Sequence, residues 1–180
     1  MSSLDVPGLD VSGRVRARDI QMAAVADLRR RVLMVSGAID VTDHDVSVCI
    51  NLPDPGRWQI IKSETNLTDQ TWVAMQVTTD EDTTFVTDAD TMILSRQFAK
   101  TFVTPDARRL MFYDGEVRPG EAVLKVFSIE ASQRRPSYAH ARYTPIAADE
   151  DVAARLEQII ADGIPPRPVV ELIVPVTVIG

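Results

Sequence analysis

The sequence predicts a mainly β protein, an antiparallel β-sandwich of the jelly-roll-like type. Between about residues 32 and 131, turn signals recur every eight to twelve residues, and apolar residues alternate with polar ones between the turns. Both features are typical of antiparallel sandwiches and barrels. No long helical pattern interrupts this region, which counts against a doubly wound parallel sheet.

Length and charge limit the classes of protein that the chain can belong to. Its 180 residues can bury one core without a disulfide or a metal. Against 19 basic side chains stand 26 acidic ones, for a net charge of −7, and the acidic residues are spread along much of the chain. Because binding to nucleic acid rests on a basic surface, we expect no nucleic-acid partner.

Neither the N-terminus nor the single cysteine points to export or to a membrane. The stretch MSSLDVPGLDVSG has no basic or apolar region of a secretory signal, and no window approaches 18 apolar residues. Cys49 lies in the alternating stretch VSVCINL, which favours a buried, inert thiol. We therefore expect a soluble protein without a membrane partner.

The N-terminal segment, residues 1–31, is expected to form an arm and a helix. Its first half carries Pro and Gly among isolated apolar residues, which suits an extended arm. Residues 17–31 end in arginines, which favour a helix C-terminus, and place apolar side chains four residues apart at Ile20, Ala24 and Leu28. This spacing predicts one amphipathic helix.

Residues 32–131 form the predicted sandwich domain. Each of its strands is a short run rich in β-branched and aromatic residues, bounded by Asp, Asn, Pro or Gly. The expected strands are 32–36, 45–52, 57–63, 71–79, 83–87, 91–95, 100–103, 109–113 and 121–130.

Two turn signals, Asp-Gly and Pro-Gly, stand close together before the last of these strands. The Pro-Gly pair suits a type II turn, which needs a positive φ at its third residue. A chain that turns twice within seven residues can pass from one sheet to the other. The following strand is apolar on both faces, so we expect either Leu124 and Val126, or else Phe127 and Ile129, to contact something outside the sandwich.

The C-terminal segment, residues 132–180, has four predicted parts. Residues 132–145 show no clear period and suggest an irregular connector, whereas residues 146–163 begin with acids, carry an apolar stripe and end at Gly, as a short helix does. The spacer PPRP, 165–168, precedes a strand that reaches the last residue.

Five aliphatic side chains of this terminal strand fall at period two on one face. Burial would stabilise each by about 1.5–3 kcal/mol, so the strand should not stay in water. It can pair within its own chain or with a neighbouring subunit, with Pro175 marking an edge. The candidate interface residues of the helices and this strand are Ile20, Leu28, Leu156, Ile160, Val170, Leu172, Val174, Val176 and Val178.

Few residues suggest catalysis or metal binding. His44 and His140 have no second histidine at a ligand spacing, and neither a nucleophile elbow nor a Gly-rich phosphate loop occurs. We therefore assign no catalytic, cofactor-binding or metal-binding residue and expect no cofactor. An acidic stretch could supply calcium ligands or form a solvated rim, and it comprises Asp80, Glu81, Asp82, Asp88 and Asp90.

Trp58 and Trp72 could form a platform for sugar rings if they were exposed. Both lie in predicted strands next to apolar residues, which favours burial in the core. The triplet Asn66-Leu67-Thr68 has the form of a glycosylation site, but it is most simply a turn.

The layout of the whole chain and the stretch LMFYDGEVRPGEAVLKVFSI resemble virion structural proteins of tailed bacteriophages. In these proteins a jelly-roll-type sandwich docks or trimerises, and extended termini lace it to its neighbours. The resemblance implies a virion protein, not an enzyme, acting in capsid decoration, head-to-tail connection, tail or fibre. Its partners would be copies of itself, possibly as a trimer, and other structural proteins.

Two further hypotheses remain open. One is a carbohydrate-binding module that uses the tryptophans, Tyr113 or the acidic loops. The other is an enzyme with an unrecognised site, such as a cupin-like barrel. Outside a virion, the expected location is the cytoplasm.

Overall fold

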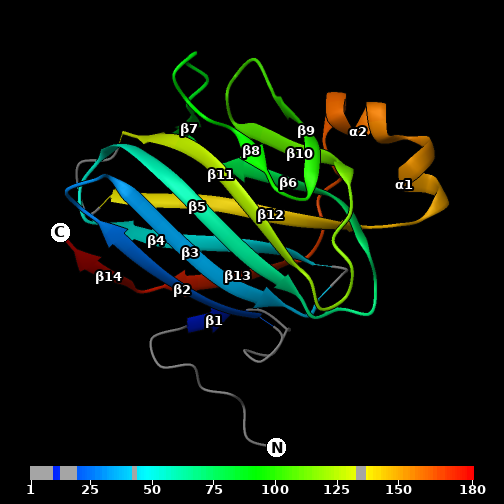
Figure 1. Ribbon diagram of the computed structural model, residues 1–180, viewed down its shortest axis with the longest axis horizontal. Helices are drawn as coiled ribbons and strands as arrows, with labels where there is room; N and C mark the ends of the chain where they lie inside the picture. The colour runs from blue at the N-terminus through cyan, green and yellow to red at the C-terminus, as the bar shows by residue number, and fades with distance from the viewer. Residues whose placement is uncertain (1–9, 13–19, 42–43, 133–136) are drawn as a thin grey trace, which may run out of the picture.

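The protein is mainly β, with strands arranged in two sheets that face each other across one hydrophobic core (Figure 1). The computed structural model describes residues 10–12, 20–41, 44–132 and 137–180. Sheet A has the order β1 (Asp10–Ser12), β13 (Val169–Val174), β4 (Asp45–Leu52), β12 (Ser137–Ala147), β6 (Trp72–Thr79), β10 (Arg109–Gly115) and β9 (Phe98–Val103). Sheet B has the order β14 (Val176–Ile179), β2 (Ile20–Asp27), β3 (Val32–Ile39), β5 (Gly56–Asn66), β11 (Ala122–Ala131) and β7 (Thr83–Phe85), and β8 (Leu94–Ser95) also pairs with β11.

All nine strands predicted between 32 and 131 are present, and β4 has the predicted bounds. Their alternating side chains explain why they form: along β5 every second residue from Trp58 to Asn66 is buried. Burial of the apolar members of each strand against the opposite sheet then builds the shared core.

The predicted helix at residues 17–31 is wrong, because residues 20–31 form β2 and a turn, while residues 17–19 lie outside the described part of the structure. Met22, Ala24 and Ala26 point into the core at period two, and β2 pairs with β3 along its whole length. A spacing of four residues fits both a helix and a strand. Pairing with β3 in a hairpin selects the strand over the helix, and no pattern within residues 17–31 reveals that pairing.

The predicted connector at residues 132–145 is also wrong, since most of it belongs to β12. This strand lies between β4 and β6 in the middle of sheet A, where both its edges are hydrogen-bonded. Its side chains between 137 and 143, including His140, lie outside the described part of the structure. Sheet pairing here overrides a sequence that lacks a clear period.

The prediction of purely antiparallel sheets needs a correction. Three pairs are parallel, namely β3 with β5, β4 with β13 and β2 with β14. Parallel neighbours require a crossover connection, and between β3 and β5 the chain supplies one by running through β4 in the opposite sheet.

The double turn before β11 is a corner between the sheets, as predicted. β10 belongs to sheet A and β11 to sheet B. Glu121 N–H donates to Arg118 O over 3.0 Å, and Gly120 has φ +85°, as the third residue of a type II turn requires.

The terminal strand divides at Pro175 and contributes to both sheets of its own chain. β13 joins sheet A, where Val170, Leu172 and Val174 are buried in the core, and β14 joins the edge of sheet B. Pro175 has no N–H to donate, which suits the point where the chain leaves one sheet for the other. Strands from the N-terminal and C-terminal segments thus complete both sheets.

The predicted second helix is present as two short helices, α1 (Glu150–Ala154) and α2 (Leu156–Asp162), which cover part of the outer face of sheet A. Asp149 caps α1 by accepting from Val152 N–H, and α2 ends at Gly163. Apolar side chains of both helices pack on a small cluster around Ala74 and Met111.

A pair of neighbouring substitutions tests the placement of β13. Leu172 is fully buried, whereas Ile173 is 56% exposed on the outer face. We expect Leu172→Ala to lower the free energy of unfolding by about 2–5 kcal/mol, because it leaves a core cavity, and Ile173→Ala to lower it by less than about 1 kcal/mol. Urea unfolding measures both, and equal losses would contradict the assignment of faces.

Candidate interaction surface

The outer face of sheet B is uncharged over most of its area, and we call it the open face. Its members point away from the core, since they alternate with buried residues, and each is exposed or half-buried. They are Ala23, Val25, Val32, Met34, Ser36, Ala38, Gln59, Ile61, Ser63, Thr65, Leu94, Ala122, Leu124 and Val126. None of these side chains is charged, although 25% of the chain is.

Strand register gathers the largest of these side chains into one row. Val25 pairs with Met34, Met34 with Ile61, Ile61 with Val126, and Val126 with Leu94. The row therefore crosses five strands of sheet B without a polar interruption. Side chains paired across adjacent strands lie close enough to contact one another, so the row forms a continuous apolar stripe.

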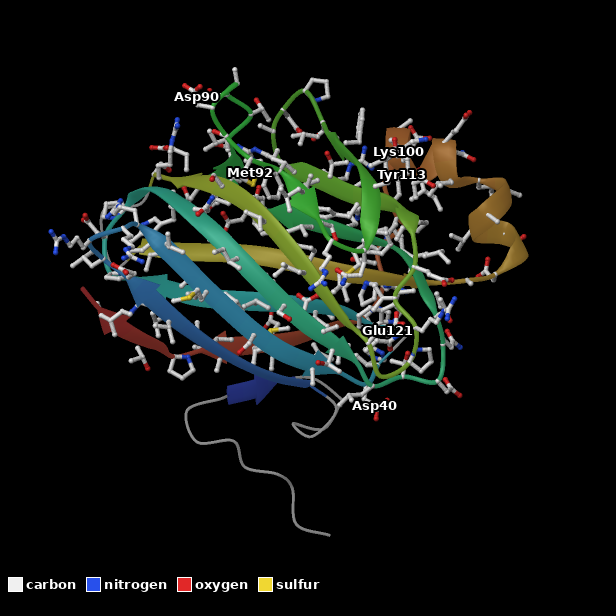
Figure 2. The ribbon with its side chains drawn as sticks, in the orientation of Figure 1. Asp40, Asp90, Met92, Lys100, Tyr113 and Glu121 are labelled. Atoms are coloured by element: carbon white, nitrogen blue, oxygen red, sulfur yellow. The ribbon has the colours of Figure 1, made fainter. Side chains whose placement is uncertain are left out.

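Among the described residues, charged side chains stand around the border of the open face. Asp27 pairs in register with Val32 at one end, and Arg96, just past β8, donates its backbone N–H to Leu124 O at the side. Arg57 and Glu130 pair with each other at one end, at 3.5 Å. Asp40 and Glu121 lie at the opposite end, beside the end of β5, where Leu67 N–H donates to Ile39 O and Asn66 N–H to Glu121 O (Figure 2). This neutral centre with a charged rim has the layout of an interface core.

The helices do not cover the open face. They pack on the outer face of sheet A, and Figure 1 shows β2, β3, β5 and β11 with no helix over them. We expected a helix or a subunit over β11. No helix in the described part of the chain packs on Leu124 and Val126, and contact with a subunit there stays a prediction. Both side chains remain half-buried, while Phe127 and Ile129 point into the core.

Beneath the open face, the inner side of sheet B carries a cluster of three charges. Lys62 and Glu64 on β5 and Lys125 on β11 are all fully buried. Lys125 Nζ donates to both carboxylate oxygens of Glu64, at 2.9 and 3.2 Å, and Lys62 Nζ lies 2.7 Å from Oε1. Lys62 and Lys125 also face each other in register, so Glu64 separates two like charges.

Burial decides how this cluster ionises. It lowers the pKa of Lys62 well below its usual value and lowers the pKa of Lys125 as well, with Glu64 opposing both changes. Burial alone would raise the pKa of Glu64, but the Lys125 and Lys62 charges outweigh it and hold this pKa low. One carboxylate can balance only one ammonium, and the charged form of Lys62 is the more strongly disfavoured of the two, because burial lowers its pKa further than that of Lys125.

Arg109 fixes the helix pair to sheet A. From β10 its guanidinium donates to three carbonyls at the end of α2: Ile159 at 3.2 Å, Ile160 at 3.0 Å and Ala161 at 2.6 Å. Ile159 O also accepts from the capping Gly163 N–H. Carbonyls in the last turn of a helix lack most of their partners within it, and a cation suits this end of the dipole. Gly163 allows the approach, because a Cβ there would stand 2.4 Å from Arg109 Nη1.

A groove of about 810 Å³ lies beside α1 and α2 and is lined in part by the Pro-rich spacer. Apart from the exposed Asp162, its charged side chains are engaged with other groups of the chain. Arg155 pairs with Asp151 at 3.5 Å, and Arg167 with the buried Asp45 at 3.1 Å. The groove thus shows no group aimed at a ligand, and we base no function on it.

Residues 22–180 match a family described as "Family of unknown function (DUF6423)". The chain belongs to this family. The match includes every residue of the open face and all three charges beneath it. Searches of curated proteins and of solved structures found no match.

The predicted interface residues divide between the core and the surface of this family member. Val170, Leu172 and Val174 are buried in the chain's own core, and the Ile20 side chain lies outside the described part. Leu28 and Val178 are exposed, and Val176, Leu156 and Ile160 are half-buried. Sequence reasoning missed the open face, although VLMVS, RWQIIKS and AVLKVF are each apolar on both faces of a strand.

The two tryptophans are buried, as expected. Trp58 donates from Nε1 to Asp54 O over 2.9 Å and stacks with the Arg31 guanidinium at 4.4 Å, and Trp72 lies wholly inside the core. Neither forms an exposed sugar platform. Asn66 is also fully buried, and its side chain accepts from Thr68 in a local turn.

The acidic stretch forms no cluster of metal ligands among the described residues. Asp80 accepts from Asp82 N–H, and Asp88 pairs with Arg57 at 3.0 Å. Cys49 is only half-buried, because it points to the outer face of sheet A rather than into the core. Burial, followed by the charges of Asp80 and Glu171, raises the pKa of its thiol.

Within the described residues, no helix has the length and apolar character needed to cross a bilayer.

Two substitutions separate the charges of the buried cluster. Glu64→Gln leaves two lysines without their counterion, and we expect a loss of about 3–5 kcal/mol in unfolding free energy. Lys62→Met keeps the Lys125–Glu64 pair intact, so stability should be unchanged or higher. A larger loss for Lys62→Met than for Glu64→Gln, measured by urea unfolding, would contradict this account.

The same cluster predicts how stability depends on pH. Because folding lowers the pKa of Lys62, the unfolded chain binds more protons between the folded pKa and about 10.4, the unfolded value. Stability should therefore rise with pH across this window, at most by about 1.4 kcal/mol per unit for one proton. Subtracting the pH profile of Lys62→Met isolates this slope, and identical slopes would refute it.

Removal of the Arg109 guanidinium should release α1 and α2. We expect Arg109→Met to increase hydrogen–deuterium exchange across residues 150–164, with little change in the strands, because three hydrogen bonds to α2 are lost. Arg108→Met is the control, since Arg108 donates instead to Glu81 O, far from the helices. Equal exchange in the two variants would contradict this role for Arg109.

Proposed function

We propose that this chain is a structural protein that assembles into a phage-like particle, in capsid decoration, head-to-tail connection, tail or fibre. The observation that carries the proposal is the open face, a neutral surface on a chain with net charge −7. Exposed apolar surface bounded by polar residues is typical of protein interfaces. Repeated docking of such a face is what assembly into a particle requires.

The fold supports the same proposal. We infer that the two facing sheets form a β-sandwich of the jelly-roll-like type, with a core contributed by both sheets. The terminal strands β13 and β14 tie the two sheets together, which suits a building block that must keep its shape. Its proposed partners are copies of itself and other structural proteins of a particle, and we propose no enzymatic activity. The proposed location is the virion.

No observation favours the carbohydrate-binding alternative. The indoles that suggested it are in the core, so the flat stacking surface that it needs is missing at Trp58 and Trp72.

Purified particles test the proposal. In the host that carries the gene, we expect the chain to co-sediment with particles in many copies, at a fixed ratio to the major particle protein, as measured by mass spectrometry with labelled reference peptides. Met34→Glu should lower this ratio, because it places a charge in the open face, whereas Ile173→Glu, with the same charge on the other sheet, should not. Recovery only as free protein would contradict the proposal.

A further inference from the structure

We propose that the occupant of the open face is the same face of a second copy of this chain, packed sheet on sheet. This inference deepens the proposed function and rests on it for its biological setting. Its physical basis is separate, in the size of the face, its charge and the chemistry of its rim.

The size of the face meets the need of a specific dimer. Thr177 of β14 pairs with Val25 and extends the five-strand row to six strands. Five strand spacings, and the rise from Gln59 to Thr65 along β5, give the face a span of at most roughly 24 by 20 Å. Two such faces in contact would together bury on the order of 1,000 Å², the lower limit for a specific interface. Sheets pack face to face at about 10 Å through interdigitating side chains, which the Met34 and Leu94 side chains can supply.

Charge favours a second copy over other partners. Two chains of net charge −7 repel each other. This repulsion is smallest when the surfaces in contact are neutral, as the open face is. A charged partner would find no opposite charge at its centre. The rim carries Asp27, Asp40, Glu121 and Glu130 against Arg57 and Arg96, and this acidic balance disfavours an anionic membrane surface.

A two-fold contact also needs a surface that is complementary to itself. Small side chains in one row, Ala23, Ser36 and Ser63, lie beside the large ones in the next, Val25, Met34 and Ile61. After a two-fold rotation, large side chains of one copy can sit over small ones of the other. The open face thus carries both the large side chains and the small ones over which they would pack.

The test is the oligomeric state of purified protein, measured by sedimentation with light scattering over a range of concentrations. We expect a dimer for the native chain and a dissociation constant at least about a hundredfold weaker for Met34→Glu, because a buried unpaired charge disfavours association. Ile173→Glu is the matched control and should dimerise like the native chain. Added salt should strengthen the dimer, since it screens the acidic rims.

Several results would overturn the inference. They are a native chain that stays monomeric at its highest soluble concentration, a Met34→Glu chain that dimerises as the native one does, or a dimer that salt dissociates. Ser36→Glu, an exposed position on the same face, repeats the test if Met34→Glu proves unfolded by circular dichroism. A further result would also overturn the inference: the native chain and folded Met34→Glu are both monomeric, and the variant has the lower melting temperature. The open face would then be covered by a segment of its own chain.

The two proposals can fail separately. A chain that is monomeric in solution but present in particles refutes the second-copy contact and leaves the structural role standing. A dimer that never enters a particle supports the contact and refutes the structural role.

Discussion

The Glu64 carboxylate holds together the centre of sheet B. It contacts the Nζ atoms of Lys62 and Lys125, from two neighbouring strands, within a core that is otherwise mostly apolar. Because side chains of a strand alternate, fixing Lys62, Glu64 and Lys125 inward also fixes Ile61, Ser63, Leu124 and Val126 outward. Charges lie inside and neutral side chains outside, the reverse of the usual pattern of a half-exposed sheet. The same strand register therefore places the ion cluster inside the core and the open face outside it.

A role in setting the strand register explains why the core can retain charged side chains that add little to its stability. Buried ion clusters contribute little to stability, but in some proteins they select one register against its alternatives. A slip of β11 by one residue against β5 would bury Leu124 and Val126 and expose Lys125, destroying both the cluster and the open face. We infer that the cluster's main effect is specificity of strand pairing, which the surface above it requires.

Strands bounded by clear turns were predictable from the sequence, and those that depend on distant partners were not. Residues 45–52 and the corner at 114–120 carry their own local signals, in alternation and in Pro-Gly chemistry. Residues 17–31 suit a helix locally, and residues 20–27 become β2 only because β3 pairs with them. β12 is also decided by distant partners. Its sequence has only a weak strand pattern, and hydrogen bonds to β4 and β6 on its two sides stabilise it as a strand.

The candidate surface was harder to predict than the fold. Apolar residues on both faces of β3, β5 and β11 were visible in the sequence, but which face lies inward depends on Lys62, Glu64 and Lys125 pairing in space. Charged residues at these positions look solvent-exposed in a linear reading. The terminal strand was the more obvious interface candidate, yet its apolar row at Val170, Leu172 and Val174 fills the chain's own core.

The most direct measurement of the central claim is methionine oxidation by peroxide, followed by peptide mass spectrometry across protein concentrations. Met34 on the open face is 41% exposed, and an added methionine-containing peptide that does not associate serves as the reference. The account predicts that oxidation of Met34 slows relative to this peptide as the protein associates. An unchanged ratio between the two rates, from dilute protein to assembled protein, would contradict it.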